Sequence, residues 1–211
     1  MPATAPLRQT HRGAVMIPVV IETRAGGDRL WDMYSRLLRD RIIMLDEPIE
    51  DRTASMVCAQ LLFLQSEAPD KPAWLYINSP GGVVTAGLAI YDTMRHVSCP
   101  VGTLCMGQAA SMGAVLLAAG QSGMRLALPS SRIMVHQPSG GFRGQARDAA
   151  IHTTEMLRLR AVLDGILAAA SGLSQDEAAA LTDRDTYLSA REAVELGLVD
   201  GVVRPIKSFR E

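Results

Sequence analysis

Cys-Met-Gly-Gln-Ala-Ala-Ser-Met-Gly-Ala-Val-Leu-Leu, residues 105–117, sets one serine, Ser111, among small residues at the start of an apolar segment. The segment predicts a strand that ends near Met106, a turn at Gly107 that a side chain would obstruct, and a helix that begins at Ser111. Unpaired N–H groups at a helix N-terminus favour a developing negative charge, as beside a nucleophile. The same serine is equally consistent with an ordinary helix N-cap.

A histidine downstream favours a nucleophilic role for this serine. In Arg132-Ile-Met-Val-His136-Gln-Pro138, apolar residues lead into His136, and Pro138 ends the element just after it. This pattern predicts a strand that delivers an imidazole to the edge of a sheet. A histidine that lies beside a serine can activate it as a nucleophile, so the two segments together favour covalent catalysis.

The composition limits the classes of protein that need to be considered. The 211 residues are 48% hydrophobic, and no Pro/Ser-rich linker divides them, so we expect one domain with a sizeable core. A formal net charge of −1 and an aromatic content of 4% provide no surface for nucleic acid. The apolar run 112–119 is far shorter than the roughly 20 residues of a membrane span, so no membrane segment is expected.

The cysteines indicate a reducing environment. Cys58, Cys99 and Cys105 lie on or beside apolar stretches, and no Cys-x-x-Cys pair is present. Disulfides and a metal site are therefore not expected, and the cytoplasm is the expected location. At the N-terminus, residues 1–16 contain basic but no acidic side chains, and we interpret them as a poorly ordered or processed leader.

Beyond the leader, helix and strand patterns alternate. Repeated strand–helix units of this length imply an α/β fold with parallel strands and crossover helices. The predicted helices cover residues 30–39, 51–66 and 85–96, and the predicted strands cover residues 41–45, 73–77 and 101–106.

A long helix is predicted over residues 146–170, after a glycine-rich segment at residues 139–145. At about 25 residues it is long for a globular helix, and we expect it to project from the domain. Either a second subunit or the chain's own sheet must cover its apolar positions, and both remain open. These positions are Ile151, Met156, Leu159, Val162, Leu163, Ile166 and Leu167.

Five motifs along the chain point to one known family. They are Tyr76-Ile-Asn-Ser-Pro-Gly-Gly82, Tyr91-Asp-Thr-Met94, Met106-Gly-Gln-Ala-Ala-Ser-Met-Gly113, Val135-His-Gln-Pro138, and Leu188-Ser-Ala190 through Gly197-Leu-Val-Asp200. Together they resemble the proteolytic subunit of the ATP-dependent Clp protease, the ClpP family of the crotonase-like superfamily. The resemblance extends from about residue 18 to residue 203.

The resemblance implies a crotonase-like ClpP fold, a spiral of strand-strand-helix units with a projecting handle helix. The helix at residues 146–170 is then the handle, which interdigitates between two stacked heptameric rings. The implied organisation is a leader or propeptide at residues 1–16, one protease domain at residues 17–203 with its handle at about 137–170, and a tail at residues 204–211.

The third catalytic residue follows only from the resemblance. Spacing cannot choose among the aspartates downstream of His136, which are Asp148, Asp164, Asp176, Asp183, Asp185 and Asp200. The resemblance implies Asp185, which stands just before Thr-Tyr-Leu-Ser, as the residue that orients His136. It also implies that the backbone N–H groups of Gly82 and Met112 form the oxyanion hole.

The implied activity is that of a serine endopeptidase that cleaves unfolded polypeptides. The chain itself needs no cofactor, because ATP is used by a partner, an AAA+ unfoldase of the ClpX or ClpA type. By resemblance, Trp74, Tyr76 and Tyr91 form a pocket for loops of this unfoldase, although ordinary core aromatics fit these positions equally well.

Two other hypotheses come from different classes. An acyl-CoA hydratase or isomerase of the crotonase superfamily shares the spiral fold, but its members rely on acidic residues and oxyanion-hole amides rather than on a serine nucleophile. Ser111 and His136 argue against it. A non-catalytic scaffold subunit of a mixed ring is the second alternative, and intact candidates at Ser111, His136 and Asp185 argue against that.

Overall fold

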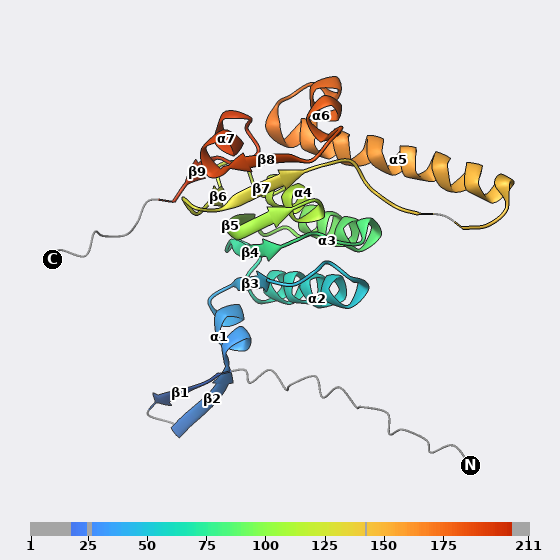
Figure 1. Cartoon of the computed structure of the whole chain (residues 1–211). Coiled ribbons are helices and arrows are strands. Elements are labelled where there is room, and N and C mark those ends of the chain that lie inside the picture. The colour runs from blue at the N-terminus through green and yellow to red at the C-terminus, as the bar shows by residue number, and fades with distance from the viewer. Residues whose placement is uncertain (1–17, 25–26, 142, 204–211) are drawn as a thin grey trace, which may run out of the picture.

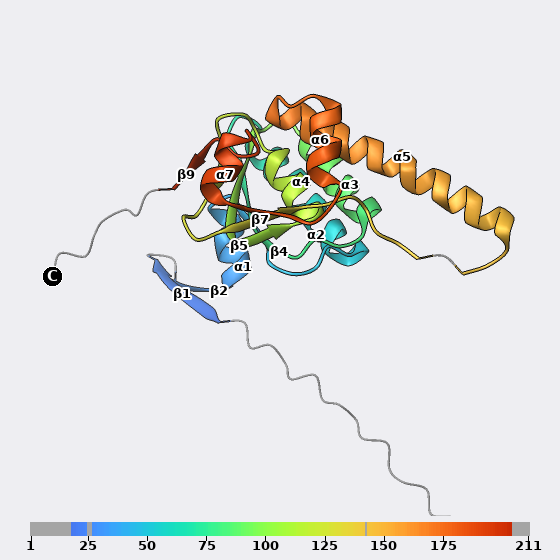
Figure 2. The ribbon, with the colours of Figure 1, turned by 45° about the horizontal axis from the view of Figure 1, so that its top comes forward.

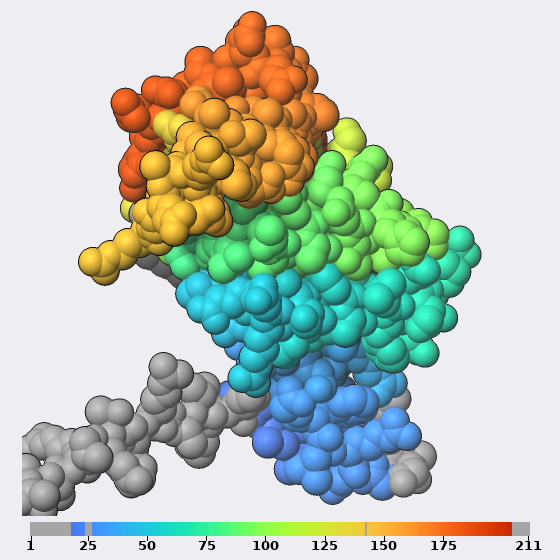
Figure 3. All heavy atoms as spheres, turned by 90° about the vertical axis from the view of Figure 1, so that its right-hand side faces the viewer, coloured from blue at the N-terminus to red at the C-terminus, as the bar shows by residue number. Residues whose placement is uncertain are grey.

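The computed structural model describes residues 18–24, 27–141 and 143–203. The predicted leader, residues 1–16, and the predicted tail, residues 204–211, lie outside the described residues. Successive segments pile up in sequence order from one end of the molecule to the other, as the colours of Figures 1 and 3 show. This stacking agrees with the expected spiral of strand and helix units.

The centre of the molecule is a mixed, mostly parallel sheet. Its main path is parallel at every step, as predicted from the alternation of strands and helices. In spatial order the path runs through β3 (Ile42–Leu45), β4 (Ala73–Ser79), β5 (Val101–Ala110), β6 (Arg125–Ala127) and β9 (Gly201–Val202).

Three crossover helices connect these strands and cover the core. They are α2 (Asp51–Glu67), α3 (Val84–His96) and α4 (Met112–Ala118), close to the predicted bounds. Most of the largest fully buried side chains come from the strands and from these helices, including Leu61 of α2, Ile90 of α3 and Leu116 of α4. The sheet face that carries Leu75 and Ile77 is therefore the inner face.

Strand β5 is longer than predicted, and its second half has a different partner. Residues 103–105 pair with β6, whereas residues 108–110 pair with β7 (Arg132–Val135). Gly107 lies between the two parts with a positive φ of 70°, and the register against β4 shifts at the same point. The predicted end near Met106 was wrong, because Gly107 bends the strand without ending it.

Strand β7 lies between two partners. On one side it pairs in parallel with β5, and on the other it pairs in antiparallel fashion with β8 (Thr186–Ser189). After β8 the chain folds into the short helix α7 (Ala190–Glu195), which begins with a capping box between Ser189 and Glu192.

The N-terminal part differs from the predicted helix over residues 30–39. Residues 30–32 belong to β2 (Gly27–Asp32), which forms a hairpin with β1 (Val19–Arg24). Helix α1 (Met33–Arg39) begins only after Asp32, whose carboxylate accepts a hydrogen bond of 2.9 Å from Ser35 N. The apolar spacing matched a helix, but the cap at Asp32 sets its start.

The predicted long helix is α5 (Ala146–Ser171), and it projects from the domain (Figures 1 and 2). Its second half packs on the domain's own core, with Leu163 and Leu167 buried. Its first half does not, since Ile151 and Leu157 are 67% and 60% exposed. Of the apolar positions that were expected to be covered either by a second subunit or by the chain's own sheet, Leu163 and Leu167 are therefore covered by their own domain. A shorter helix, α6 (Gln175–Thr182), folds back on the second half.

No helix in the described residues is both long and apolar enough to cross a membrane.

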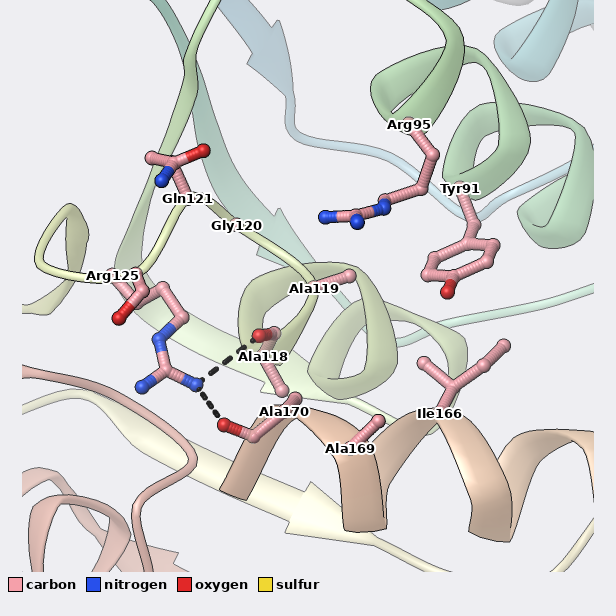
Figure 4. A pocket seen from close by; sticks show the side chains of 11 residues that line it. Tyr91, Arg95, Ala118, Ala119, Gly120, Gln121, Arg125, Ile166, Ala169 and Ala170 are labelled. Carbon is pink, nitrogen blue, oxygen red and sulfur yellow. Dashed lines mark hydrogen bonds between the residues drawn. The ribbon is translucent and has the colours of Figure 1, made fainter. Parts of the chain in front are cut away.

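A buried arginine locks the later elements together. The guanidinium of Arg125 donates hydrogen bonds to Ala118 O and Ala170 O, carbonyls at the C-terminal ends of α4 and α5 (Figure 4). It also pairs with Asp200, just before β9. Tyr91 and Arg95 line the remaining space, a pocket of about 300 Å³. Because helix C-terminal ends meet here, we interpret the two arginines as compensating for their partial negative charge.

Replacing Arg125 with methionine should destabilise the fold by about 3 kcal/mol, because a carboxylate and two helix-end carbonyls lose their donor. Urea unfolding at fixed protein concentration measures the change. The same substitution at Arg52, exposed on α2, should cost no more than about 0.5 kcal/mol. An unchanged midpoint for Arg125→Met would contradict the assigned role.

The same pair should make stability depend on pH. Burial raises the pKa of Asp200, but hydrogen bonds from Arg125 outweigh burial and hold the pKa below its ordinary value of 3.8. The stabilisation is therefore complete above the unfolded-state pKa and is lost as the pH falls through the lower folded-state pKa. The difference in unfolding midpoint between wild type and Asp200→Asn should accordingly shrink below about pH 4.

Candidate active site

Ser111 forms the turn between β5 and α4. Its φ of 53° and ψ of −122° are rare for a residue with a side chain and cost about 1–3 kcal/mol. A hydrogen bond of 2.8 Å from Ser111 N to Met134 O fixes the turn against β7. A sharp strand-to-helix turn of this kind presents a serine hydroxyl at the top of a sheet in several hydrolases.

The hydroxyl of Ser111 does not act as an ordinary helix cap. In the described part of the chain it makes no hydrogen bond, either to the first turn of α4 or to His136. Ser111 is half-buried, so the hydroxyl remains accessible. The N-cap alternative therefore loses its main support.

Two adjacent glycines allow close backbone contacts in the neighbouring loop, Gly81 against this turn and Gly82 against Ile49. A Cβ atom on Gly81 would lie 2.5 Å from Ala110 O and 2.7 Å from Ser111 Cβ. A Cβ atom on Gly82 would collide with Ile49 O. Gly81 was missed by sequence reasoning, although the Pro-Gly-Gly run contained the signal that close backbone approach requires.

The expected oxyanion donors belong to these two segments. Ile49 N–H donates to Gly81 O, and Val83 N–H donates to Ile49 O. The N–H of Gly82 takes no part in these two hydrogen bonds. Met112 is the first residue of α4, where a helix leaves its N–H groups unpaired. A Cβ atom on Gly81 would lie 3.0 Å from Met112 N, so the two backbone segments adjoin beside the serine.

His136 and Asp185 face each other across the β7–β8 pair. Val135 pairs with Thr186 in antiparallel register, so the next position outward places His136 opposite Asp185. His136 Nδ1 lies 2.9 Å from Asp185 Oδ1. With Nδ1 donating to the carboxylate, Nε2 is the ring nitrogen that can accept a proton. The His136 side chain is 24% exposed and the Asp185 side chain 59%.

The register of β7 brings all three candidates to one end of the strand. Ala110 pairs with Met134, so Ser111 follows beside Val135, one residue before His136. Of the aspartates that spacing could not separate, Asp164 is buried against Thr182, Asp183 lies near Arg160 and Asp200 pairs with Arg125. Asp185 is the one that contacts His136 among the described residues.

The three aromatic residues expected to form a docking pocket do not lie together within one chain. Trp74 and Tyr76 alternate with the buried residues of β4 and so face away from the core. Tyr91, on α3, packs against the core from the other side. Among the remaining histidines, His96 ends α3 and His152 lies on α5, and His11 is outside the described residues.

Cys105, the cysteine nearest to Ser111 in the sequence, offers no competing nucleophile. All three cysteines are free, and Cys105 is fully buried. Burial raises the pKa of the Cys105 thiol to about 11, only partly offset by a hydrogen bond with Ser131, so the reactive thiolate is scarce at neutral pH. Within the described ranges, no three His, Cys, Asp or Glu side chains are grouped as metal ligands.

Among models of protein families, the one described as Clp protease matches residues 25–205, a span that contains Ser111, His136 and Asp185.

Proposed function

The chain belongs to the Clp protease family, a family of peptidases, and from this premise we propose that it is the serine endopeptidase subunit of an ATP-dependent protease. The observation that carries the proposal is the His136–Asp185 hydrogen bond of 2.9 Å beside the strained turn at Ser111. A nucleophile, a base and an orienting carboxylate are the combination by which many serine hydrolases form an acyl-enzyme intermediate.

Each group has a defined role in the proposed reaction. His136 Nε2 takes the proton of the Ser111 hydroxyl as its oxygen attacks the peptide carbonyl, and Asp185 holds the ring in the required tautomer. The N–H groups of Gly82 and Met112 stabilise the oxyanion, a contribution of roughly 3 kcal/mol for one donor. His136 then protonates the leaving amine, and the ester on Ser111 is hydrolysed by water.

The proposal includes partners. An AAA+ unfoldase of the ClpX or ClpA type uses ATP to unfold substrates and deliver them to two stacked heptameric rings of this chain. For docking, the outward-facing Trp74 and Tyr76 are better placed than Tyr91, which packs on the core. The free cysteines support a reducing compartment, and we place the protein in the cytoplasm.

The hydratase or isomerase alternative has less support. That chemistry does not require a serine on a strained turn, nor a histidine held by a carboxylate beside it. The scaffold alternative would not need to keep this geometry, whose strain has a cost.

Ser111→Ala, His136→Ala and Asp185→Asn test the proposal. We expect each to lower kcat for a short peptide by about 10³-fold or more, because the members of a triad act as a unit. Peptide hydrolysis without ATP is the measurement, and sedimentation checks that assembly is unchanged. Wild-type turnover in Asp185→Asn would show that another carboxylate serves His136.

The same preparation tests the need for a partner. Wild-type protein alone should leave a stably folded substrate intact and should degrade it once an unfoldase and ATP are added. Degradation of the folded substrate at the same rate without them would contradict the proposal.

The projecting half of α5 supports the proposed assembly. Exposed Ile151 and Leu157 lie on a helix half that its own domain does not cover, and a second copy across a ring–ring interface would bury them. The segment between His136 and α5 connects this half to the site. We propose that contact between rings orders the site, including the Ser111–His136 hydrogen bond.

Leu157→Arg combined with Ile151→Arg should therefore produce single rings or smaller species, because unpaired charge in an apolar interface is unfavourable. Peptidase activity should fall with assembly although the site residues are unchanged. Ala161→Arg, at an exposed position in the packed half of the same helix, is the control. Sedimentation and peptide hydrolysis on one preparation decide the matter, since an active single ring would contradict the coupling.

A further inference from the structure

The orienting carboxylate of the proposed site is unusually open to solvent. The Asp185 side chain is 59% exposed and lies in the loop between α6 and β8. Exposed loops are generally the more mobile parts of a structure. A carboxylate on a mobile loop could not hold an imidazole in one orientation. The backbone of this loop must therefore be held by other contacts.

Gln137 makes two of these contacts. Its backbone N–H donates to Thr182 O at 2.6 Å, and its side-chain Nε2 donates to Asp183 O at 2.7 Å. Both acceptors lie at the C-terminal end of α6, where a helix leaves carbonyl groups unpaired. Asp183 is two residues before Asp185, so the side chain of Gln137 holds the loop just before the residue that bears the orienting carboxylate.

Further contacts of the loop connect it to other elements, including the approach of Arg160 on α5 to Asp183. The buried Thr182 hydroxyl donates to Asp164 Oδ1 at 2.7 Å, which ties the end of α6 to α5. The Thr186 hydroxyl donates to Leu181 O at 2.8 Å, which joins β8 to α6, the two elements on either side of the loop. Gln137 is different because it adjoins His136 in the chain. It connects the loop to the segment that carries the imidazole.

We propose that Gln137 is a positioning residue, whose side-chain amide keeps Asp185 aligned with His136. This inference rests on the proposed peptidase function. Pro138 restricts Gln137 to an extended backbone, which limits where its side chain can lie. Glutamine then supplies an N–H donor at the required length. Methionine has a similar length without a donor, and glutamate replaces the donor with an acceptor.

Gln137→Met and Gln137→Glu test the amide in the assembled wild-type background. We expect each to lower kcat for a short peptide by about tenfold to a hundredfold while KM changes less than about twofold, because substrate binding is left in place. Gln175→Met is the matched control, since the Gln175 amide also donates to a backbone carbonyl, Ala161 O, but not in this loop. The control should have wild-type kcat.

A double-mutant comparison separates positioning from general stability. If Gln137 acts through Asp185, adding Gln137→Met to Asp185→Asn should change kcat less than about twofold. An equal loss in both backgrounds, or wild-type kcat in both single variants, overturns the inference. Failure of both single variants to sediment like wild type also overturns it, since Gln137 would then be needed for folding. Absence of peptidase activity in the wild type would instead overturn the proposed function itself.

Discussion

The pairing of β7 with β5 on one side and β8 on the other is the constraint on which the rest depends. The parallel register with β5 places Ser111 beside Val135, and the antiparallel register with β8 places Asp185 opposite His136. A shift of one residue in either register would turn alternate side chains to the opposite face of the sheet. The core side chains Ile133 and Val135, fully buried on β7, oppose such a shift.

Strain at Ser111 is tolerated because its surroundings are rigid. The conformation of this residue costs about 1–3 kcal/mol, and contacts on three sides hold it. These are the hydrogen bond to Met134 O, the fully apolar helix α4 that follows, and the backbone of Gly81 in direct contact. Arg125 in turn fixes the far end of α4 to α5 and, through Asp200, to β9. The position of the site thus depends on contacts among elements from most of the chain.

Local patterns predicted the features that depend on neighbouring residues. The helices and strands of the core follow from periodicity, and Ser111 and His136 stand out beside a turn and a proline. Asp185 required a family resemblance, because its partner His136 is 49 residues away and the β7–β8 pairing leaves no local signature. The division of α5 could not be predicted either, since Ile151 and Leu163 belong to the same set of expected apolar positions and only the point where the helix leaves the domain separates them. Gln137 was missed because its proposed role depends on a hydrogen bond to the same distant loop.

The central claim is that the register of β7 makes Ser111 a nucleophile. Reaction of the assembled protein with a fluorophosphonate probe, followed by mass-spectrometric mapping of the adduct, tests it most directly. The account predicts one adduct, on Ser111, which forms far more slowly in His136→Ala. An adduct on a different serine, or peptidase activity that persists while Ser111 stays unmodified, would contradict it.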